Sequence, residues 1–480
     1  MSVPELPPRT PAHRRVFANR TLNMRAIRAV GFDMDYTLVH YKVQVWEQRA
    51  YEHAQTLLAN KGWPVAALQF DPTLVTVGLI LDLETGNLVK ASRFGYITRA
   101  FHGTKPLAFA DQRRCYAGVF VDLREPRWIF LNTLFSLSEA TLYAQCVDLL
   151  DAGQLDAALG YESLYRVVRG AIDRTHMEDA LKSEIAKNPE PFIEPDPELV
   201  PTLLDLKDAG KLLLLITNSE WSYSLAILNH VIDRELPDGQ TFRELFDIVI
   251  VSAQKPGFFT AQSSLFELVD DSGLLRPSRG PLTKGHAYLG GNARQVERDL
   301  DLAPEDILYV GDHLYSDVHV TKDMLRWRTG LVLRDLEPEL EALESFRETQ
   351  GKLTLLMQQK VELEEQLDTN KLLLQRERGG RAPLPNVASV RQAITELRTQ
   401  IDALDAQIAP LARAAGALNN PHWGLIMRAG IDKSYLARQV ERYADVYTSR
   451  VSNFALCTPF AYLRAPQVSL PHDEGLPVSD

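Results

Sequence analysis

The pattern of apolar and polar positions along the chain is dominated by four short, largely apolar runs. They cover residues 27–32, 211–217, 246–255 and 306–317. Segments with helical spacing separate them, and one of these is an amphipathic stretch at 197–209 that ends before Gly210. Short buried strands that alternate with helices are typical of a parallel sheet with helices on both faces. We therefore predict an α/β fold with a doubly wound, Rossmann-like sheet.

Each apolar run ends in polar side chains. Asp33 and Asp35 follow the first run, and Thr217 and Asn218 stand at the end of the second. Lys255 ends the third run, and Asp312 and Asp317 lie at the end of the fourth. The carboxyl ends of parallel strands meet at one edge of the sheet, where the active sites of such folds lie. We therefore predict that the four groups form one site. Each group also has a purely structural explanation. These are turn hydrogen bonds, a helix N-cap, a solvated lysine and loop-capping aspartates. To replace a common site, all four explanations would have to be true at the same time.

The first run delivers two carboxylates onto one turn. Side chains at positions i and i+2 of an extended segment point the same way, so Asp33 and Asp35 can face one reacting group. In aspartate-based phosphoryl transfer, Asp33 would attack and Asp35 would handle the proton. Thr217 and Asn218 could bind phosphate oxygens, and the dipole of a following helix would assist them.

The last two runs supply opposite charges. Pro256 follows Lys255 and stops the strand, so the lysine ammonium is presented at the strand end. Asp312 and Asp317 follow a tight turn at Gly311, and their carboxylates are suited to hold Mg²⁺ directly or through water. The predicted cofactor is therefore Mg²⁺.

A long insertion separates the first run from the second, and it exceeds what one crossover helix needs. We predict that it forms a mainly helical cap domain that selects the substrate. The predicted boundaries are a mobile N-terminal arm at 1–13, a catalytic core at 14–45 and 195–335, the cap at 46–194, a helical hairpin at 336–415, and a C-terminal segment at 416–480 that packs on the core.

The hairpin is predicted from composition and spacing. The segment is rich in Leu, Glu, Gln and Lys, and its helical pattern breaks at 379–387, GGRAPLPNV. Its leucines form an irregular apolar seam, and these are Leu353, Leu356, Leu363, Leu367 and Leu374. This pattern favours a helical arm that packs on the core or on a partner subunit over an independent coiled coil.

Composition narrows the possible classes of function. The formal net charge of −11 and the isoelectric point near 5.6 give no basic surface for wrapping duplex nucleic acid. The three cysteines are far apart and lack metal-ligand spacing, which favours a reducing compartment, so we expect a cytoplasmic protein. No uninterrupted apolar run reaches membrane-spanning length, so we expect no membrane partner.

In their order along the chain, the four groups resemble the motifs of the haloacid dehalogenase superfamily and, within it, those of the phosphatases. The resemblance implies that Asp33 is the nucleophile and that Asp35 is the general acid and base. It also implies that Thr217 and Lys255 bind phosphoryl oxygens. True dehalogenases usually lack the second aspartate, because a halide needs no proton, so Asp35 indicates an oxygen leaving group.

The same resemblance implies a ligand set for the metal. Mg²⁺ would take oxygens from Asp33, from the backbone carbonyl of Asp35 and from Asp312. Asp317 would lie nearby and orient either ligand waters or Lys255.

A closer resemblance covers nearly the whole chain. The segments 16–42 (VFANRTLNMRAIRAVGFDMDYTLVHYK), 307–318 (ILYVGDHLYSDV) and 441–454 (ERYADVYTSRVSNF) are similar to the cytosolic purine 5′-nucleotidase family. That family acts on inosine and guanosine monophosphates. The resemblance implies hydrolysis of IMP, GMP and their deoxy forms through an aspartyl-phosphate, phosphotransfer to nucleosides, and a homo-oligomer, either a dimer or a tetramer.

The cap contains candidates for nucleotide recognition. Arg169, Asp173 and His176 fall at i, i+4 and i+7, on one face of a predicted helix. The residues alone favour a solvated, ion-paired face. The resemblance implies instead that these positions contact the base and sugar, that Lys182 binds substrate, and that Phe135 packs against the purine. The spacing puts Lys182 off the helical face unless the helix has ended.

The resemblance also implies an adenylate effector site that includes Asn132 and Tyr315. In our alignment, Asp122 and Asp323 stand where two basic residues would hold the effector phosphates, and carboxylates repel phosphate. Activation by ATP is therefore either lost or dependent on other basic residues, such as Lys322, Arg326 and Arg328.

Two alternatives to a purine nucleotidase remain from the sequence. One is a phosphatase for another phosphorylated metabolite. The other is a non-catalytic scaffold that keeps the fold and binds a protein through its helical arm.

Overall fold

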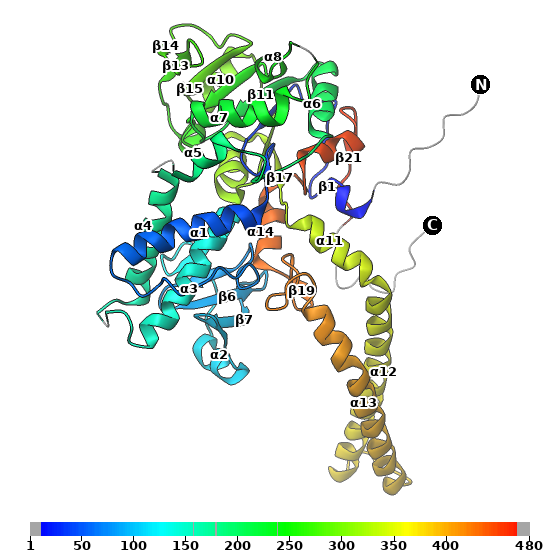
Figure 1. Cartoon of the computed structure of the whole chain (residues 1–480). Helices are drawn as coiled ribbons and strands as arrows, with labels where there is room; N and C mark the ends of the chain where they lie inside the picture. Colours follow the sequence, from blue (N-terminus) through cyan, green and yellow to red (C-terminus); the bar gives the residue numbers. More distant parts are fainter. Residues whose placement is uncertain (1–10, 157, 178–179, 238, 468–480) are drawn as a thin grey trace, which may run out of the picture. The chain divides into compact units, whose positions relative to one another are not determined.

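The structure is a computed structural model that describes residues 11–156, 158–177, 180–237 and 239–467. The chain divides into two compact units (Figure 1). The first comprises residues 1–337 and 426–480, and the second comprises residues 338–425.

The first unit is built on a ten-stranded sheet. In spatial order its strands are β1 (Phe17–Ala18), β20 (Val446–Thr448), β17 (Arg328–Val332), β16 (Ile307–Gly311), β3 (Ala29–Phe32), β11 (Leu212–Ile216), β12 (Ile248–Val251), β15 (His286–Gly290), β13 (Leu265–Leu268) and β14 (Leu275–Pro277). The strands from β20 to β15 are parallel, and β1, β13 and β14 are antiparallel additions at the two edges.

Strand β3 is the point where the strand order reverses. The chain runs outward from β3 through β11, β12 and β15, and then returns to the other side of β3 with β16 and β17. This is a doubly wound sheet, so the prediction of the fold class is confirmed. Ligands of such sheets bind outside the carboxyl ends of the strands at the reversal point.

The four predicted strands form at β3, β11, β12 and β16, and the predicted helix at 197–209 is α6 (Leu199–Asp208). The last two strands are shorter than their apolar runs. Strand β12 ends at Val251, and Ser252 and Gln254 follow with φ of 46° and 58°, which an extended strand cannot contain. Strand β16 ends at Gly311.

Helices cover the sheet, and the core is apolar between them. Besides α6, the helices of this part are α7 (Trp221–Leu228), α8 (Phe242–Leu245), α9 (Gly257–Thr260), α10 (Ala293–Asp299) and α14 (Tyr435–Tyr443). Every residue of β3, β12 and β16 is buried, as expected for strands that are covered on both faces.

The cap lies between β4 (His40–Tyr41) and β10 (Ile193–Glu194), which pair with each other in antiparallel fashion. Its helices are α1 (Val43–Asn60), α2 (Phe109–Tyr116), α3 (Leu137–Asp151), α4 (Tyr161–Met177) and α5 (Ala180–Lys187). Helices α1, α3 and α4 lie side by side (Figure 1).

The cap also contains a five-stranded antiparallel sheet, which the prediction of a mainly helical cap did not include. In spatial order its strands are β8 (Lys105–Pro106), β7 (Ile97–His102), β6 (Asn87–Ala91), β5 (Ile80–Asp82) and β9 (Trp128–Phe130). Strand β7 is only partly buried and carries Arg99 and His102 among its apolar residues, so it lacks the continuous apolar run of the core strands.

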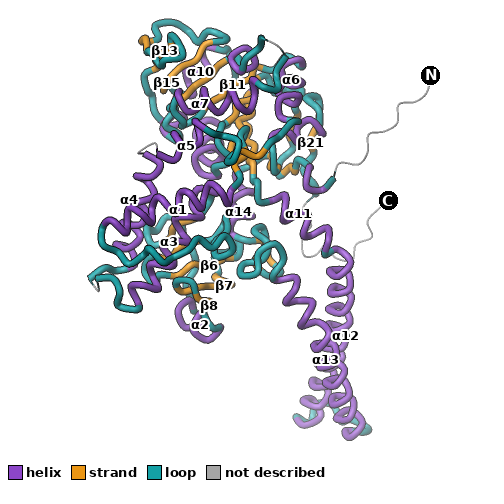
Figure 2. The backbone as a smooth tube through the Cα atoms, viewed as in Figure 1, coloured by secondary structure: helices purple, strands orange, loops and turns teal. Residues whose placement is uncertain are grey.

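The second unit is a helical hairpin, as predicted. Helix α11 (Leu336–Ser345) leads into α12 (Arg347–Arg378), which packs against α13 (Val387–Gly416) (Figure 2). The apolar contacts along the hairpin include Leu367, Leu374, Ile394, Leu397 and Ile401. Lys360 also pairs with Asp405 across the two helices at 2.6 Å.

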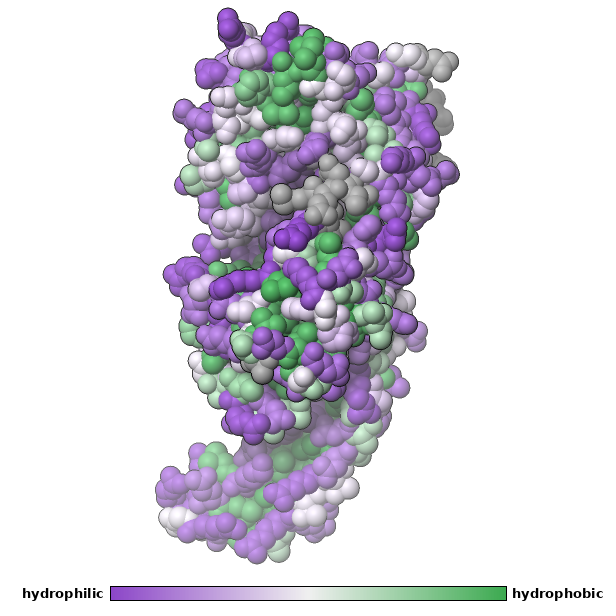
Figure 3. Space-filling view, turned by 60° about the vertical axis from the view of Figure 1, so that its left-hand side comes forward, coloured by the Kyte–Doolittle hydropathy of each residue, from purple (hydrophilic) through white to green (hydrophobic). Residues whose placement is uncertain are grey.

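Polar side chains predominate on the face of the molecule drawn in Figure 3, where apolar side chains form small separate patches. Within the described residues, no helix combines the length and apolarity needed to cross a membrane.

Candidate active site

The site is built at the carboxyl ends of β3, β11, β12 and β16. Asp33 directly follows β3, and its backbone N–H donates to the carbonyl of Val310 in β16 at 2.9 Å, so the sheet holds the backbone of Asp33. Lys255 follows β12 and reaches the same place, because its ammonium lies 2.8 Å from Asp33 Oδ1. The structure therefore brings together residues that are more than 200 positions apart in the sequence.

Lys255 is the centre of this cluster. Besides Asp33, its ammonium contacts Asp317 Oδ1 at 2.9 Å and donates to the hydroxyl of Tyr309 at 3.1 Å. The Lys255 side chain is only 2% exposed. Burial alone would lower the pKa of Lys255, but the carboxylates of Asp317 and Asp33 outweigh it and hold the pKa well above its usual value. Lys255 is therefore a fixed cation.

Tyr309 supports this cation from within β16. Its hydroxyl accepts from Lys255 and donates to the carbonyl of Ile216 at 2.9 Å. The Tyr309 ring crosses Gly31 in the neighbouring strand, where a Cβ atom would lie only 2.8 Å from the ring. The sequence analysis missed this residue. The available signal was a phenol inside an apolar strand, because a buried hydroxyl needs a partner.

Three carboxylates gather beside Lys255. Asp33, Asp312 and Asp317 each offer an oxygen, and these atoms lie within 4.8 Å of one another. Burial raises the pKa of Asp33 to about 7 even though Lys255 opposes the shift, and burial with the charges of Asp33 and Asp317 raises that of Asp312 well above its usual value. One lysine does not offset three carboxylates, so the residues present fit a divalent cation.

Gly311 is required by the closeness of Asp317. A Cβ atom at position 311 would lie 2.5 Å from the Asp317 side chain. Asp317 is fully buried, and its Oδ2 accepts from the backbone N–H of His313 at 3.1 Å. The tight turn predicted at Gly311 thus holds Asp317 against Lys255.

Asp35 faces a different set of groups. Its Oδ1 accepts from the Tyr41 hydroxyl at 2.5 Å, and its Oδ2 accepts from the Ser219 hydroxyl at 2.5 Å. The sequence analysis did not identify Tyr41 or Ser219. Tyr41 lies within the quoted segment 16–42 and Ser219 directly follows Asn218, but their contact with Asp35 depends on how β4 and the loop after β11 meet.

Thr217 and Asn218 lie at the end of β11, as predicted from their position. The Asn218 side chain accepts from the backbone N–H of Lys255 at 2.6 Å and donates to the Lys255 carbonyl at 3.1 Å. Asn218 therefore braces the backbone of Lys255. The hydroxyl of Thr217 accepts from the backbone N–H of Ser219 at 3.1 Å, and α7 begins two residues later without a side-chain cap.

The cap residues predicted to recognise the nucleotide lie on α4 and α5. Arg169 pairs with Asp173 at 3.1 Å, as expected at i and i+4, and also with Glu139 of α3 at 3.1 Å. His176 belongs to α4, but its side chain lies outside the described residues. Lys182 lies near the start of α5, and its ammonium donates to the Ser219 hydroxyl at 3.1 Å. Lys182 therefore reaches the strand-end site from the cap.

Phe135 lies in an aromatic cluster next to this edge. Its ring is 4.7 Å from Tyr36 and 5.6 Å from Trp46, both in edge-to-face geometry. Tyr36 follows Asp35, so the cluster connects the cap with the first motif. The Phe135 side chain is only partly buried.

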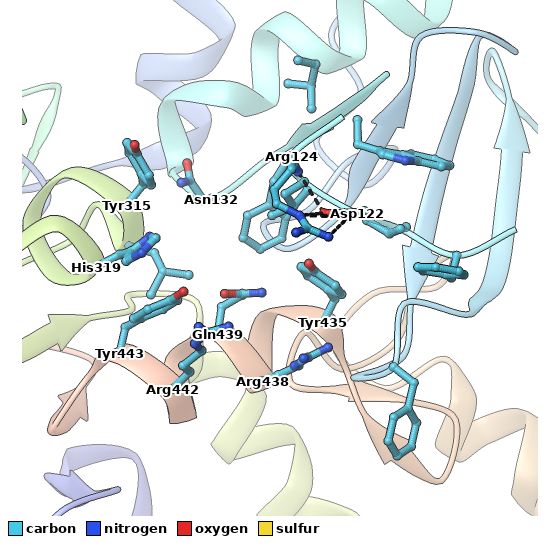
Figure 4. A pocket seen from close by; sticks show the side chains of 18 residues that line it. Asp122, Arg124, Asn132, Tyr315, His319, Tyr435, Arg438, Gln439, Arg442 and Tyr443 are labelled. Carbon is cyan, nitrogen blue, oxygen red and sulfur yellow. Dashed lines mark hydrogen bonds and ion pairs between the residues drawn. The ribbon is translucent and has the colours of Figure 1, made fainter. Parts of the chain in front are cut away.

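A separate pocket of about 810 Å³ contains Asn132 and Tyr315 (Figure 4). Other lining residues come from α14, namely Tyr435, Arg438, Gln439, Arg442 and Tyr443. Figure 4 shows Asn132 and Tyr315 on one side of this space and the α14 residues on the other. The pocket is lined by many aromatic side chains, and the His319 ring stacks on Tyr443 at 3.9 Å.

The charges around this pocket are paired locally. Asp122 accepts from Arg124, which holds the pKa of Asp122 at about 2, and Asp323 contacts His319 at 3.0 Å. Lys322 and Arg328, two of the basic residues considered for effector binding, instead bind the buried carboxylate of Asp445 at 2.6 and 2.9 Å. These two cations already have a structural partner.

A doubly wound sheet with these groups at its strand ends defines a hydrolase of the haloacid dehalogenase superfamily. The sequence model of the 5′ nucleotidase family matches residues 16–475, and the chain belongs to that family. Family membership identifies the chain as a phosphoric monoester hydrolase of the 5′-nucleotidase type and confirms the resemblance noted in the sequence.

Two mammalian proteins are similar over most of their length. The chain is 28% identical to human 5′-nucleotidase domain-containing protein 2 over 453 residues, covering 91% of this chain and 81% of that protein. It is also 28% identical to the rat protein of the same name over 473 residues, covering 94% and 79%.

Solved structures to which the chain shows some similarity include an archaeal β-phosphoglucomutase from Pyrococcus. The match has a TM-score of 0.31 and 11% identity, and covers 64% of this chain and 86% of that one. A haloacid dehalogenase-like hydrolase from Bacteroides fragilis gives a TM-score of 0.26 and 15% identity, with coverage of 64% and 87%. The fold assignment itself rests on the strand order described above.

Proposed function

We propose that this chain is a Mg²⁺-dependent 5′-nucleotidase that hydrolyses purine nucleoside 5′-monophosphates, namely IMP, GMP and their deoxy forms. The observation that carries the proposal is the buried ion cluster in which Lys255 binds Asp33 and Asp317 at 2.8 and 2.9 Å beside Asp312. A carboxylate held by a fixed cation at the end of the reversal strand suits in-line attack on phosphorus.

The reaction has two steps that use the same carboxylates. In the first, an oxygen of Asp33 forms a bond to phosphorus, the bond to the 5′ oxygen breaks, and that oxygen keeps the electron pair and takes a proton from Asp35. In the second, water attacks phosphorus, Asp35 takes the water proton, and the bond to Asp33 breaks to release phosphate. Lys255 and Thr217 offset charge on the phosphoryl oxygens in both steps.

Asp33, Asp312 and the backbone carbonyl of Asp35 would hold Mg²⁺, with Asp317 in support. When bound, the ion would neutralise charge on the phosphoryl group. Removal of divalent cations with EDTA should abolish phosphate release, and added Mg²⁺ should restore it.

The preference for a purine nucleotide rests on the cap. Arg169, Asp173, His176 and Lys182 match substrate positions of the purine 5′-nucleotidase family, and Phe135 offers a partly exposed aromatic ring. Lys182 contacts Ser219 beside the catalytic carboxylates, which supports a position close to the substrate. The same family membership supports phosphotransfer to nucleosides, a homo-oligomer and a cytoplasmic location.

The resemblance noted in the sequence supports assigning the pocket around Asn132 and Tyr315 to the family's adenylate effector site. We propose that it responds weakly to adenine nucleotides, because the carboxylate of Asp122 lines the pocket and that of Asp323 contacts the lining residue His319. Arg438 and Arg442 line the same space and are its remaining basic groups besides Arg124 and His319.

The test is phosphate release from a panel of substrates with Mg²⁺. The panel contains IMP, GMP, their deoxy forms, AMP, pyrimidine nucleotides and sugar phosphates, and Asp33→Asn serves as the catalytic control. The proposal expects the 6-oxopurine nucleotides to be preferred and the variant to be inactive. A preference for sugar phosphates would indicate a different metabolite phosphatase, and a wild-type protein inactive on the whole panel would indicate a scaffold.

A further inference from the structure

The proposed proton-transferring carboxylate, Asp35, lies at the centre of a partly buried chain of hydrogen bonds. Tyr41 donates to one oxygen of Asp35 and Ser219 donates to the other, both at 2.5 Å. The Tyr41 hydroxyl is in turn 2.8 Å from the hydroxyl of Tyr223, and Ser219 accepts from Lys182 at 3.1 Å. Five side chains therefore form one continuous network.

Counting hydrogens fixes the direction of this network. Tyr41 and Ser219 each have one hydroxyl hydrogen, and both are used in the bonds to Asp35. Tyr223 must therefore be the donor to Tyr41. Burial, followed by the charge of Asp35, holds the pKa of Tyr41 and of Tyr223 well above its usual value, so both phenols keep their protons.

The network joins both sides of the cap to Asp35. Tyr41 belongs to β4, the strand that leads into the cap, and β4 pairs with β10, the strand that leads out of it. Lys182 belongs to α5 at the other end of the cap sequence, and its ammonium lies 4.9 Å from the ring centre of Tyr223 in α7 of the core. A shift of either cap segment would change the donors that hold Asp35.

We propose that Tyr41, supported by Tyr223 and opposite Ser219 and Lys182, positions Asp35 for proton transfer and links its orientation to the position of the cap. These are positioning residues, since none of the contacts above involves the attacking oxygen of Asp33. The inference rests on the proposed function, because it assigns the network to the proton transfers of that reaction.

The two proton transfers make different demands on the network. In the second step Asp35 takes a proton from water, and it can accept from both donors while it does so. To donate in the first step, Asp35 must carry the proton, and one of the two bonds must be given up to the leaving oxygen. Ser219 is the donor that the cap contacts through Lys182, and Tyr41 is the donor on the other oxygen of Asp35.

The test measures how fast the Tyr41→Phe variant and the wild type hydrolyse two substrates that differ only in their leaving group. The substrates are the purine nucleotide that the wild type hydrolyses best and its analogue with sulfur in place of the bridging 5′ oxygen. A thiolate leaves with little need for a proton, because thiols are far more acidic than alcohols. Rapid-quench kinetics would follow nucleoside release and phosphate release separately.

We expect Tyr41→Phe to lower kcat for the oxygen ester by about 10- to 100-fold, with KM changed by less than about 2-fold. For the sulfur ester, the first step should keep its rate within about 2-fold, while the second step, which needs Asp35 as a base, should slow. The variant should therefore show a burst of nucleoside thiol before phosphate appears. Tyr223→Phe should give the same pattern with a smaller loss.

The matched control is Tyr51→Phe. Tyr51 is equally buried, and its hydroxyl donates to Gln145 Oε1 at 2.5 Å within the cap, so the change removes a buried phenol of the same kind away from Asp35. Its kcat should stay within about 2-fold of wild type. Equal losses for the oxygen and sulfur esters without a burst, or unchanged kinetics in Tyr41→Phe, would overturn the inference.

The activity of the wild type distinguishes a failure of this inference from a failure of the proposed function. If the wild type is active, Asp33→Asn is inactive and Tyr41→Phe behaves like Tyr51→Phe, the nucleotidase stands and only the network role fails. If the wild type releases no phosphate from any ester, the proposed function fails and takes the network role with it.

Discussion

The catalytic cluster and the pocket around Asn132 use charge in opposite ways. Lys255 is 2% exposed and shares its charge between Asp33 and Asp317, which lie far from it in the sequence. In the pocket, Asp122 pairs with Arg124, whose side chain is 90% exposed, only two residues away. The first arrangement depends on the whole sheet and the second on one loop. Buried charges are therefore constrained together, whereas the pocket charges can change singly without disturbing the fold.

The strongest test of this contrast makes the same substitution, Asp to Asn, in both regions and compares the activity of the two variants. Asp33→Asn removes the proposed nucleophile, so kcat should fall on the order of 10⁴-fold or more. Asp323→Asn makes the same change beside the pocket and should leave kcat without effector within about 2-fold. Steady-state phosphate release measures both, and similar activity in the two variants would contradict the contrast.

Removing a cation from each region should change the free energy of unfolding by different amounts. Lys255→Met leaves two buried carboxylates without their cation, so the free energy of unfolding should fall by about 3 kcal/mol. Arg442→Met removes a pocket cation, and the free energy of unfolding should change by less than about 0.5 kcal/mol. Urea denaturation of both variants gives the two values, and a Lys255→Met protein as stable as wild type would show that the cluster is not a structural unit.

A third prediction concerns the buried acid Glu47 in α1 and the pH dependence of the free energy of unfolding. The Glu47 carboxylate accepts from the backbone N–H of Ser138 at 2.8 Å, and burial raises its pKa to about 7 despite this bond. Between its unfolded pKa and about pH 7, the folded state then holds a proton that the unfolded state lacks. This contribution is complete at acidic pH and is lost as pH rises, by up to about 1.4 kcal/mol per pH unit.

The measurement is urea denaturation at pH 5, 6 and 7 of the wild type and Glu47→Gln. The difference between them isolates Glu47 from other titrating groups, such as buried His40, whose pKa is lowered to about 3 by burial and nearby arginines. The stability of wild type relative to the variant should decline with pH. A constant difference would mean that Glu47 stays ionised throughout.

The smallest expected effect concerns the pocket itself. Asp122→Arg combined with Asp323→Lys converts two repelling charges into attracting ones next to Arg438 and Arg442. ATP affinity should rise by about tenfold, equivalent to about 1.4 kcal/mol, in titration calorimetry. Alanine at both positions is the control that removes repulsion without adding attraction. Tight ATP binding by the wild type would contradict the role assigned to the two acids.

The core was predictable because its strands are buried on both faces. The runs at β3, β11, β12 and β16 are continuously apolar, and the chemistry follows at their ends. The cap sheet was not predictable in this way. In β7, ITRAFH, polar residues interrupt the apolar pattern, and its partner β6 contains Lys90, so neither segment differs clearly from a loop.

The gathering of residues at the strand ends was predictable where the proposed chemistry needs one residue type. Asp33, Asp35 and Lys255 stand out because their positions after strands suit phosphoryl transfer. Tyr309 and Tyr41 do not, because their roles come from contacts across strands: Tyr309 reaches Lys255 past Gly31, and Tyr41 reaches Asp35 from β4. Spacing along the chain carries no information on such contacts.

The order of strands in the core also has a consequence for synthesis. Strand β1, near the start of the chain, pairs with β20 at 446–448, and β20 also completes the edge beside β17. On a ribosome that adds about 5–20 residues per second, roughly 20–90 s separate the appearance of these two partners. Among the strands that the structure describes, β1 must therefore wait for β20, and until then its edge of the nascent sheet is open to chaperones and to other chains.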